Sequence, residues 1–256
     1  STTETPTSST PTTTSPSSIY LNSYNLEDEE FGTSVEVTVN SITRTLTSNA
    51  LPNHKTGAFP NNGNPNTISP QNVTYSYILN PTYVGSATEV RTTGVAVNGV
   101  KFEPGTAETT TCNSGEILRL EGLQDTYNLG MDFNNAHVGR GGLYHYHGIA
   151  DSLTTTSGSS LVGYAGDGFE IHYLNTQKTS GWTLKQGVRP SSGPPGQYDG
   201  TYNEDYIYTG GPNKLDQCNG GAMSGYYVYF ITNTYPFVPR CLHGEVSKDF
   251  NIGGQR

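Results

Sequence analysis

Residues Ala136 to His147 read AHVGRGGLYHYH, and this stretch decides how the chain folds around its most reactive side chains. Successive side chains of a β-strand point to opposite faces, so His145 and His147 lie on one face and the two intervening tyrosines on the other. The glycine-rich segment before them is typical of a tight turn, which would fold His137 back beside the pair as in a hairpin. Three imidazoles that converge in this way form a ligand set suited to copper or zinc.

Two acidic residues could complete this metal site. Asp132 precedes the glycine turn, and Asp167 stands between two glycines, where a carboxylate can approach a ligand closely. Each is a candidate for a fourth ligand or for an acceptor that orients an imidazole through its second nitrogen. Two alternatives stay open: a polar, hydrogen-bonded cluster without a metal, and an ordinary Asp-Gly turn at Asp167.

The remaining sequence favours strands and turns. Valines at positions 35, 37 and 39 alternate with polar residues, which is the period of an amphipathic strand. Further strands are predicted at 43–47, 74–79, 94–97, 116–120, 142–147, 168–173 and 226–232. Segments 61–66 and 190–200 are rich in Gly, Pro and Asn and predict long irregular loops. The expected fold is mostly β: a sandwich-like domain over 19–256 with long loops, preceded by an extended arm over 1–18.

The composition excludes several classes of protein. Only 14% of the residues are charged and the net charge at pH 7 is -9, whereas nucleic-acid binding needs clustered Lys and Arg. No stretch approaches the roughly 18 consecutive apolar residues of a membrane span. The chain begins at Ser1 without a methionine, as expected for a secreted or cell-surface protein whose leader has been removed. A chain cut at an arbitrary boundary would look the same.

The arm over residues 1–18 consists of Ser, Thr and Pro apart from one Glu. Such a segment does not fold by itself, and its composition matches O-glycosylated stalks, with a plain disordered linker as the alternative. The expected O-glycan acceptors are Thr2, Thr3, Thr5, Thr7, Thr10, Thr12, Thr13 and Thr14. Asn72 begins an N-glycosylation triplet with Val73 and Thr74, although such triplets also arise by chance.

Three cysteines fit an extracellular protein with one disulfide and one remaining thiol. We predict a bond between Cys218 and Cys241, because both lie in the same Gly- and Tyr-rich C-terminal region. A disulfide that closes a loop of about 22 residues stabilises a fold by roughly 3 kcal/mol in the loop-entropy model. Cys112 would then be free or paired between chains. The alternative is that all three cysteines are reduced.

Six motifs in one order give the chain a resemblance to a known family. The segment 134–148, which contains the three histidines, looks like the defining motif of the YHYH-domain family of bacterial and protist proteins. Further similar motifs occur at 48–54 with 59–60, 94–100, 161–169, 215–220 and 235–241, so the resemblance spans roughly residues 40–244. It implies kinship of fold and export, since the members are mostly predicted exported proteins. It does not imply a reaction, because the family is defined by its motif.

The resemblance also marks residues by position. The motif residues that carry over are His54, His137, His145, His147, Asp167, Asp216 and Asn219. Of these, His54, Asp216 and Asn219 are candidates for an additional site, with a solvated loop histidine as the alternative for His54. His172 and His243 are expected to be structural or surface residues. The chain departs from the family pattern at Ala136, where Gly is usual, and at Glu170, where Pro is usual, and the second change would alter the loop over any site.

Three functions are compatible with these features. We favour a secreted, glycosylated structural protein, a subunit of an extracellular fibre or surface assembly that forms a homo-oligomer or homopolymer through its arm. In this interpretation the metal site is a built-in feature and no residue is catalytic. The second is an extracellular copper or zinc enzyme that uses the histidine cluster. The third is a sugar- or metal-binding module, since Tyr side chains and Trp182 suit stacking on sugar rings. Calcium is less favoured, because Asp199, Asn203 and Asp205 lack a following bidentate Glu.

Overall fold

Strands make up most of the regular structure in the computed structural model, which describes residues 19–157 and 159–250. The predictions for the arm and its threonines lie outside these residues. The strands are β1 (Tyr24–Asp28), β2 (Thr33–Val39), β3 (Thr43–Ser48), β4 (Val73–Ile78), β5 (Thr88–Glu89), β6 (Gly94–Ala96), β7 (Lys101–Phe102), β8 (Gly105–Thr111), β9 (Ile117–Glu121), β10 (Ala136–Val138), β11 (Tyr144–Tyr146), β12 (Leu161–Ala165), β13 (Glu170–Tyr173), β14 (Trp182–Leu184), β15 (Tyr206–Tyr208), β16 (Gly220–Met223), β17 (Tyr226–Ile231) and β18 (Cys241–Leu242). The helices are α1 (Asp151–Ser157) and the short 3-10 turns η1 (Ile19–Leu21), η2 (Asn175–Gln177) and η3 (Asn203–Asp205).

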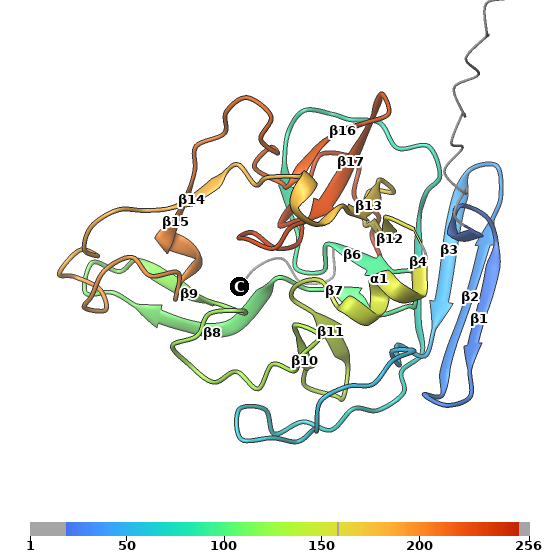
Figure 1. Cartoon of the computed structure of the whole chain (residues 1–256), viewed down its shortest axis with the longest axis horizontal. Helices are drawn as coiled ribbons and strands as arrows, with labels where there is room; N and C mark the ends of the chain where they lie inside the picture. The colour runs from blue at the N-terminus through green and yellow to red at the C-terminus, as the bar shows by residue number, and fades with distance from the viewer. Residues whose placement is uncertain (1–18, 158, 251–256) are drawn as a thin grey trace, which may run out of the picture.

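Two larger sheets organise these strands, as Figure 1 shows. An eight-stranded sheet in the order β10-β11-β7-β6-β12-β13-β17-β16 lies at the centre, and the antiparallel sheet β1-β2-β3-β4 lies beside it. Two-stranded pairs β8-β9, β14-β15 and β18-β5 complete the described fold. The prediction of a mostly-β domain with long loops is confirmed, and the expected strands match β2 to β4, β6, β9, β11, β13 and β17.

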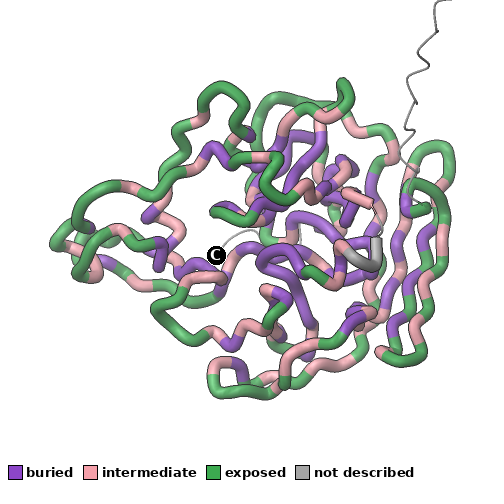
Figure 2. Tube along the Cα trace, viewed as in Figure 1, coloured by how far each residue is buried: buried purple, intermediate pink, exposed green. Residues whose placement is uncertain are grey.

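The two sheets share one hydrophobic core, as a sandwich-like domain requires. Strand β2 alternates as its sequence predicts: Val35 and Val37 are buried and Glu36 is exposed. Across the interface, the ring of Tyr77 on β4 stacks on Tyr164 of β12 with centroids 5.7 Å apart. Each buried apolar side chain of this kind contributes about 1.5–3 kcal/mol relative to an exposed one. Figure 2 shows the buried residues concentrated in the central strands and the exposed ones in the outer loops.

The long loop over residues 49–72 fixes the hairpin β10-β11 in place. The side-chain amides of Asn64 and Asn66 donate to the Val138 carbonyl of β10 at 2.9 and 2.8 Å. Figure 1 shows this loop passing beneath the hairpin. The first predicted loop segment, 61–66, therefore has a structural role, because it satisfies a carbonyl at the outer edge of the large sheet, where β11 is the one strand of the described residues that pairs with β10.

None of the helices in residues 19–157 and 159–250 combines the length and the apolar character needed to cross a membrane.

Candidate metal centre

The glycine turn folds the chain into the hairpin that the sequence predicts. Strands β10 and β11 pair antiparallel, and the register sets His137 opposite His145. The turn closes with the Gly139 N–H donating to the Leu143 carbonyl at 2.9 Å. Gly141 and Gly142 have φ angles of +90° and +89°, a region in which residues with a Cβ are strained. The turn therefore needs glycine at these two positions.

All three motif histidines converge on one face of this hairpin. The ring centroid of His137 lies 4.7 Å from that of His145 and 4.7 Å from that of His147, and the latter two are 4.9 Å apart. The Nε2 atoms of His137 and His147 are 3.2 Å apart. Two nitrogens bound to one tetrahedral zinc at about 2.0–2.1 Å would lie roughly 3.3 Å apart. The spacing of this pair therefore suits ligands of a single ion.

Backbone carbonyls orient two of the rings. Nδ1 of His137 lies 2.9 Å from the Leu129 carbonyl, and Nδ1 of His145 lies 3.1 Å from the Leu143 carbonyl. A carbonyl only accepts hydrogen bonds, so both Nδ1 atoms carry the proton and both Nε2 atoms keep a free lone pair. A histidine held in this way by a carbonyl behind it is the usual arrangement of a metal ligand.

Burial keeps the rings neutral. His145 is 5% exposed and His147 is 0% exposed. Burial, reinforced by the neighbouring imidazoles, lowers the pKa of both rings well below the usual value for histidine. Metal ions bind the neutral ring, so both are ready to act as ligands at neutral pH. His137 is half-buried and forms the more accessible side of the cluster.

His147 is positioned by close packing. Its Nδ1 is buried and makes no well-formed hydrogen bond within residues 19–157 and 159–250. A Cβ on Gly122 would lie 2.4 Å from this atom, closer than real Cβ contacts come. Gly122, just after β9, thus leaves the space in which the ring stands. The histidines' ligand atoms all lie within 4.8 Å of one another, so the three side chains could hold a metal ion.

A family model described as YHYH protein matches residues 74–244, about two thirds of the chain. The chain belongs to the YHYH protein family. No curated protein and no solved structure shows significant similarity to it. The match contains the whole histidine hairpin but begins after His54. Together with a disulfide, membership in the YHYH family points to an exported protein.

Asp132 lies on the other face of the YHYH hairpin. Its Oδ2 accepts hydrogen bonds from the Tyr144 hydroxyl at 2.8 Å and from the Gly57 N–H at 2.9 Å. Tyr144 and the histidines leave the hairpin on opposite faces because of the strand period. The structure therefore places Asp132 as the acceptor that anchors a tyrosine, and it does not belong to the cluster of ligand atoms.

Asp167 lies in the tight turn between β12 and β13. Its Oδ2 accepts hydrogen bonds from the Tyr229 hydroxyl at 2.7 Å and the Gly244 N–H at 2.8 Å. The side chain is buried, and burial raises the pKa of its carboxyl group. Asp167 thus ties the turn to strand β17 and to the segment after β18. The structure does not bring it into the histidine cluster.

The three candidates for an additional YHYH site do not share hydrogen-bond partners. Nε2 of His54 lies 2.6 Å from the Tyr146 hydroxyl, on the tyrosine face of the hairpin. Asp216 accepts a hydrogen bond from the Tyr227 hydroxyl at 2.7 Å. The side-chain amide of Asn219 donates to backbone and side-chain oxygens of residues 230 and 232 at 2.8 and 2.9 Å. His54 is buried, at 6% exposure, so it is not a solvated loop histidine.

The oxygen atoms considered for calcium serve arginines instead. Both oxygens of Asp205 accept hydrogen bonds from Arg189, at 2.8 and 2.6 Å, and Asp199 pairs with the same guanidinium. Burial raises the pKa of the Asp199 carboxyl, but hydrogen bonds from Thr201 and then from Arg189 outweigh this effect, so the pKa is lowered overall. Asn203 accepts a hydrogen bond from Arg240 at 2.9 Å. A cation there would have to displace these guanidinium groups.

The cysteines pair as the sequence predicts. Cys218 and Cys241 form the disulfide, with Cα atoms 4.9 Å apart. Cys112 is free and buried. Asn72 is exposed just before β4, as an N-glycan acceptor must be, and its modification stays a prediction.

The supporting positions of the metal centre, Gly122 and the Leu129 carbonyl, were not predicted, because close packing and backbone acceptors leave no signal in the sequence.

Proposed function

We propose that this YHYH protein is an exported metal-binding protein in which His137, His145 and His147 hold one copper or zinc ion. The observation that carries the proposal is the convergence of the three imidazoles, whose ligand atoms lie within 4.8 Å of one another. Two of these rings are already oriented by backbone carbonyls. A site formed before the ion arrives loses little free energy to rearrangement when the ion binds.

The donor set selects the class of metal. Three imidazole nitrogens suit copper and zinc, whereas calcium and magnesium require oxygen ligands. Neither Asp132 nor Asp167 supplies such an oxygen, since both are committed to tyrosines. The bound ion would join β10 to the segment after β11 and so staple the outer edge of the large sheet.

The test is metal analysis of the native protein followed by titration. The native protein is expected to contain one copper or zinc ion per chain, and the chelator-stripped protein to take up one equivalent. His145→Asn and His147→Asn should each weaken binding by more than about 100-fold, because even the loss of an orienting partner costs 10–100-fold. His172→Asn is the matched control. It removes an equally buried ring that contacts Ser160 and Glu170 instead of the cluster. Unchanged affinity in His145→Asn would refute the proposal.

A metalloenzyme is the second candidate, and one observation favours it. The cluster contains three protein ligands, the number that catalytic zinc sites use while a fourth position binds water or substrate. The half-buried ring of His137 lies on the accessible side. Titration of the copper-loaded protein with azide tests for an open position. An enzyme site should show a spectral change on azide binding, and a saturated ion should show none.

The prediction of a fibre or surface subunit stays a prediction. The arm that motivates it lies outside the described residues. Electron microscopy of native material would show filaments or ordered assemblies, and monodisperse monomers would contradict it.

Sugar binding through Trp182 also stays a prediction. Its indole N–H donates to the Gln217 carbonyl at 2.9 Å, and its ring packs edge-on against Tyr208 and Tyr235.

A further inference from the structure

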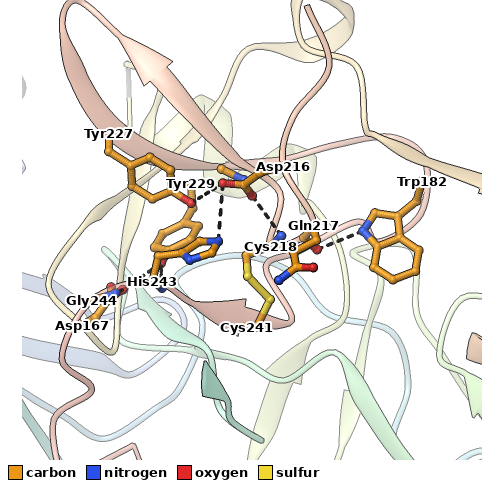
Figure 3. The surroundings of a disulfide bond; sticks show 11 residues. Asp167, Trp182, Asp216, Gln217, Cys218, Tyr227, Tyr229, Cys241, His243 and Gly244 are labelled. Atoms are coloured by element: carbon orange, nitrogen blue, oxygen red, sulfur yellow. Dashed lines mark hydrogen bonds and ion pairs between the residues drawn. A yellow bond between two sulfur atoms is a disulfide. The ribbon is translucent and has the colours of Figure 1, made fainter. Parts of the chain in front are cut away.

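A second group of ligand atoms lies beside the disulfide, away from the histidine hairpin. Asp216, Cys218 and His243 each place one ligand atom within 4.8 Å of the others. Asp216 and Cys218 precede strand β16, and His243 directly follows β18. Figure 3 draws the carboxylate of Asp216 and the ring of His243 next to the Cys218–Cys241 bond. The disulfide therefore joins two segments that lie 23 residues apart in the sequence.

His243 is buried without satisfying its polar atoms. The residue is 4% exposed, and neither ring nitrogen makes a hydrogen bond within the described part of the chain. Nε2 lies 3.6 Å from Oδ2 of Asp216, and the ring stacks on Tyr83 with centroids 4.9 Å apart. An unsatisfied buried polar atom costs about 1–3 kcal/mol. This ring is thus fixed in place with a nitrogen free for a ligand.

Asp216 is held in a single orientation. Its Oδ1 accepts hydrogen bonds from the N–H groups of Cys218 at 2.9 Å and Gly220 at 2.8 Å. Its Oδ2 accepts one from the Tyr227 hydroxyl at 2.7 Å and is the oxygen that faces His243. The carboxylate and the imidazole are therefore positioned before any ion binds. Cys218 cannot act as a thiolate ligand in this state, because its sulfur is bonded to Cys241.

We propose that reduction of the Cys218–Cys241 disulfide converts this group into a zinc site. A small dithiol reductant transfers two electrons and two protons: its own thiols become a disulfide, and Cys218 and Cys241 become thiols. Zinc then displaces both thiol protons to solvent and binds the two thiolates, His243 and Asp216. Two sulfurs, one nitrogen and one oxygen give zinc the four ligands of its tetrahedral sites.

Because Cys218 and Cys241 are buried, their reduced thiols are better suited to binding a small ion than to exchange with a thiol of another protein. Cys218 is 0% exposed and Cys241 is 8% exposed, so a small dithiol has better access to the sulfur atoms than the thiol of a bulky partner protein, because exchange requires in-line attack. Two thiolates left in this interior without a cation would be strongly disfavoured. The proposal does not depend on the histidine hairpin, which contains no sulfur.

Cobalt can separate the two sites, because a thiolate bound to Co²⁺ gives a near-ultraviolet charge-transfer band and an imidazole does not. The full chain is titrated with Co²⁺ before and after reduction by a dithiol. The oxidised chain should bind cobalt without this band. The reduced chain should bind one further equivalent with the band, and added Zn²⁺ should abolish it. In His147→Asn the band should persist even if the hairpin no longer binds metal.

Two variants make the result specific. In the double variant Cys218→Ser and Cys241→Ser, the disulfide constraint is absent and this site has no thiolate, while the buried Cys112 is common to all variants, so neither the extra equivalent nor the band should appear. In reduced His243→Asn, affinity for the extra equivalent should fall by more than about tenfold, while reduced His172→Asn keeps it. No extra equivalent on reduction, or a band that His243→Asn leaves unchanged, overturns the proposal. Loss of the tyrosine circular dichroism in the reduced chain with zinc present overturns it as well, since zinc must hold the reduced domain folded.

Discussion

His137 and His145 lie opposite each other in the register of the β10-β11 hairpin, with ring centroids 4.7 Å apart. Opposite residues of an antiparallel pair share one face, and His147 reaches the same face two residues further along. One hairpin therefore supplies all three ligands of the proposed site. Metal binding at this place is coupled to the formation of a local element, and the coupling can be measured as stability.

The first prediction concerns that coupling. Zinc added to the metal-free protein at 100 times its dissociation constant should raise the free energy of unfolding by about 2.7 kcal/mol, because the ion binds the folded chain in preference to the unfolded one. Urea unfolding with and without zinc measures the difference. His145→Asn should lose this increment and His172→Asn should keep it. Equal stabilisation in both variants would place the ion elsewhere.

The second prediction separates Asp132 from the ligands. Asp132→Asn replaces one of the two acceptor oxygens by an NH2 donor, so either the Tyr144 hydroxyl and the Gly57 N–H or the Asn134 N–H loses its acceptor. The free energy of unfolding should fall by about 1–3 kcal/mol. Zinc affinity should stay unchanged, because the residue serves the tyrosine face. Calorimetric titration checks this in folded protein, and Tyr144→Phe, which removes the same hydrogen bond, is the matched control. Loss of zinc binding in Asp132→Asn alone would make Asp132 a ligand.

Much of this architecture follows from local sequence rules, and the rest depends on distant contacts. Alternation and a glycine turn suffice to predict that His137 meets His145 and His147, because the period of two and the hairpin are local properties. The partners of Asp132 and Asp167 could not be predicted, because Gly57 and Gly244 reach them from distant loops.

The second cluster has a local signal in the sequence. His243 is buried rather than on the surface, and it stands two residues after Cys241, the cysteine that the sequence predicts to bond with Cys218. A disulfide brings the residues next to one cysteine close to the residues next to the other, so a histidine two residues from Cys241 lies near the residues that flank Cys218. Asp216, two residues before Cys218, therefore has its imidazole neighbour at His243, whereas the family motifs alone group it with His54.

The third prediction tests the space around His147. Gly122→Ala would set a Cβ 2.4 Å from Nδ1 of His147, so the ring must move away from the other two. Zinc affinity should fall by about 10–100-fold, as for loss of an orienting contact. Gly105→Ala is the matched control, since its added methyl meets nothing within 4 Å. The same titration measures both variants, and equal affinities would show that the position of His147 does not matter.

The fourth prediction concerns His54, whose pKa is lowered by burial. Its Nδ1 faces the Lys55 carbonyl and its Nε2 faces the Tyr146 hydroxyl, so the neutral ring satisfies both. Because the unfolded chain takes up this proton first as the pH falls below about 6.5, stability is lost on acidification, by up to about 1.4 kcal/mol per pH unit. Between pH 7.5 and 5.5, the metal-free protein should therefore lose more unfolding free energy than His54→Gln, which cannot titrate. All other groups are common to both proteins and cancel in the comparison of urea unfolding curves. Equal losses would mean that His54 titrates normally and that its ring does not depend on the hydroxyl of Tyr146.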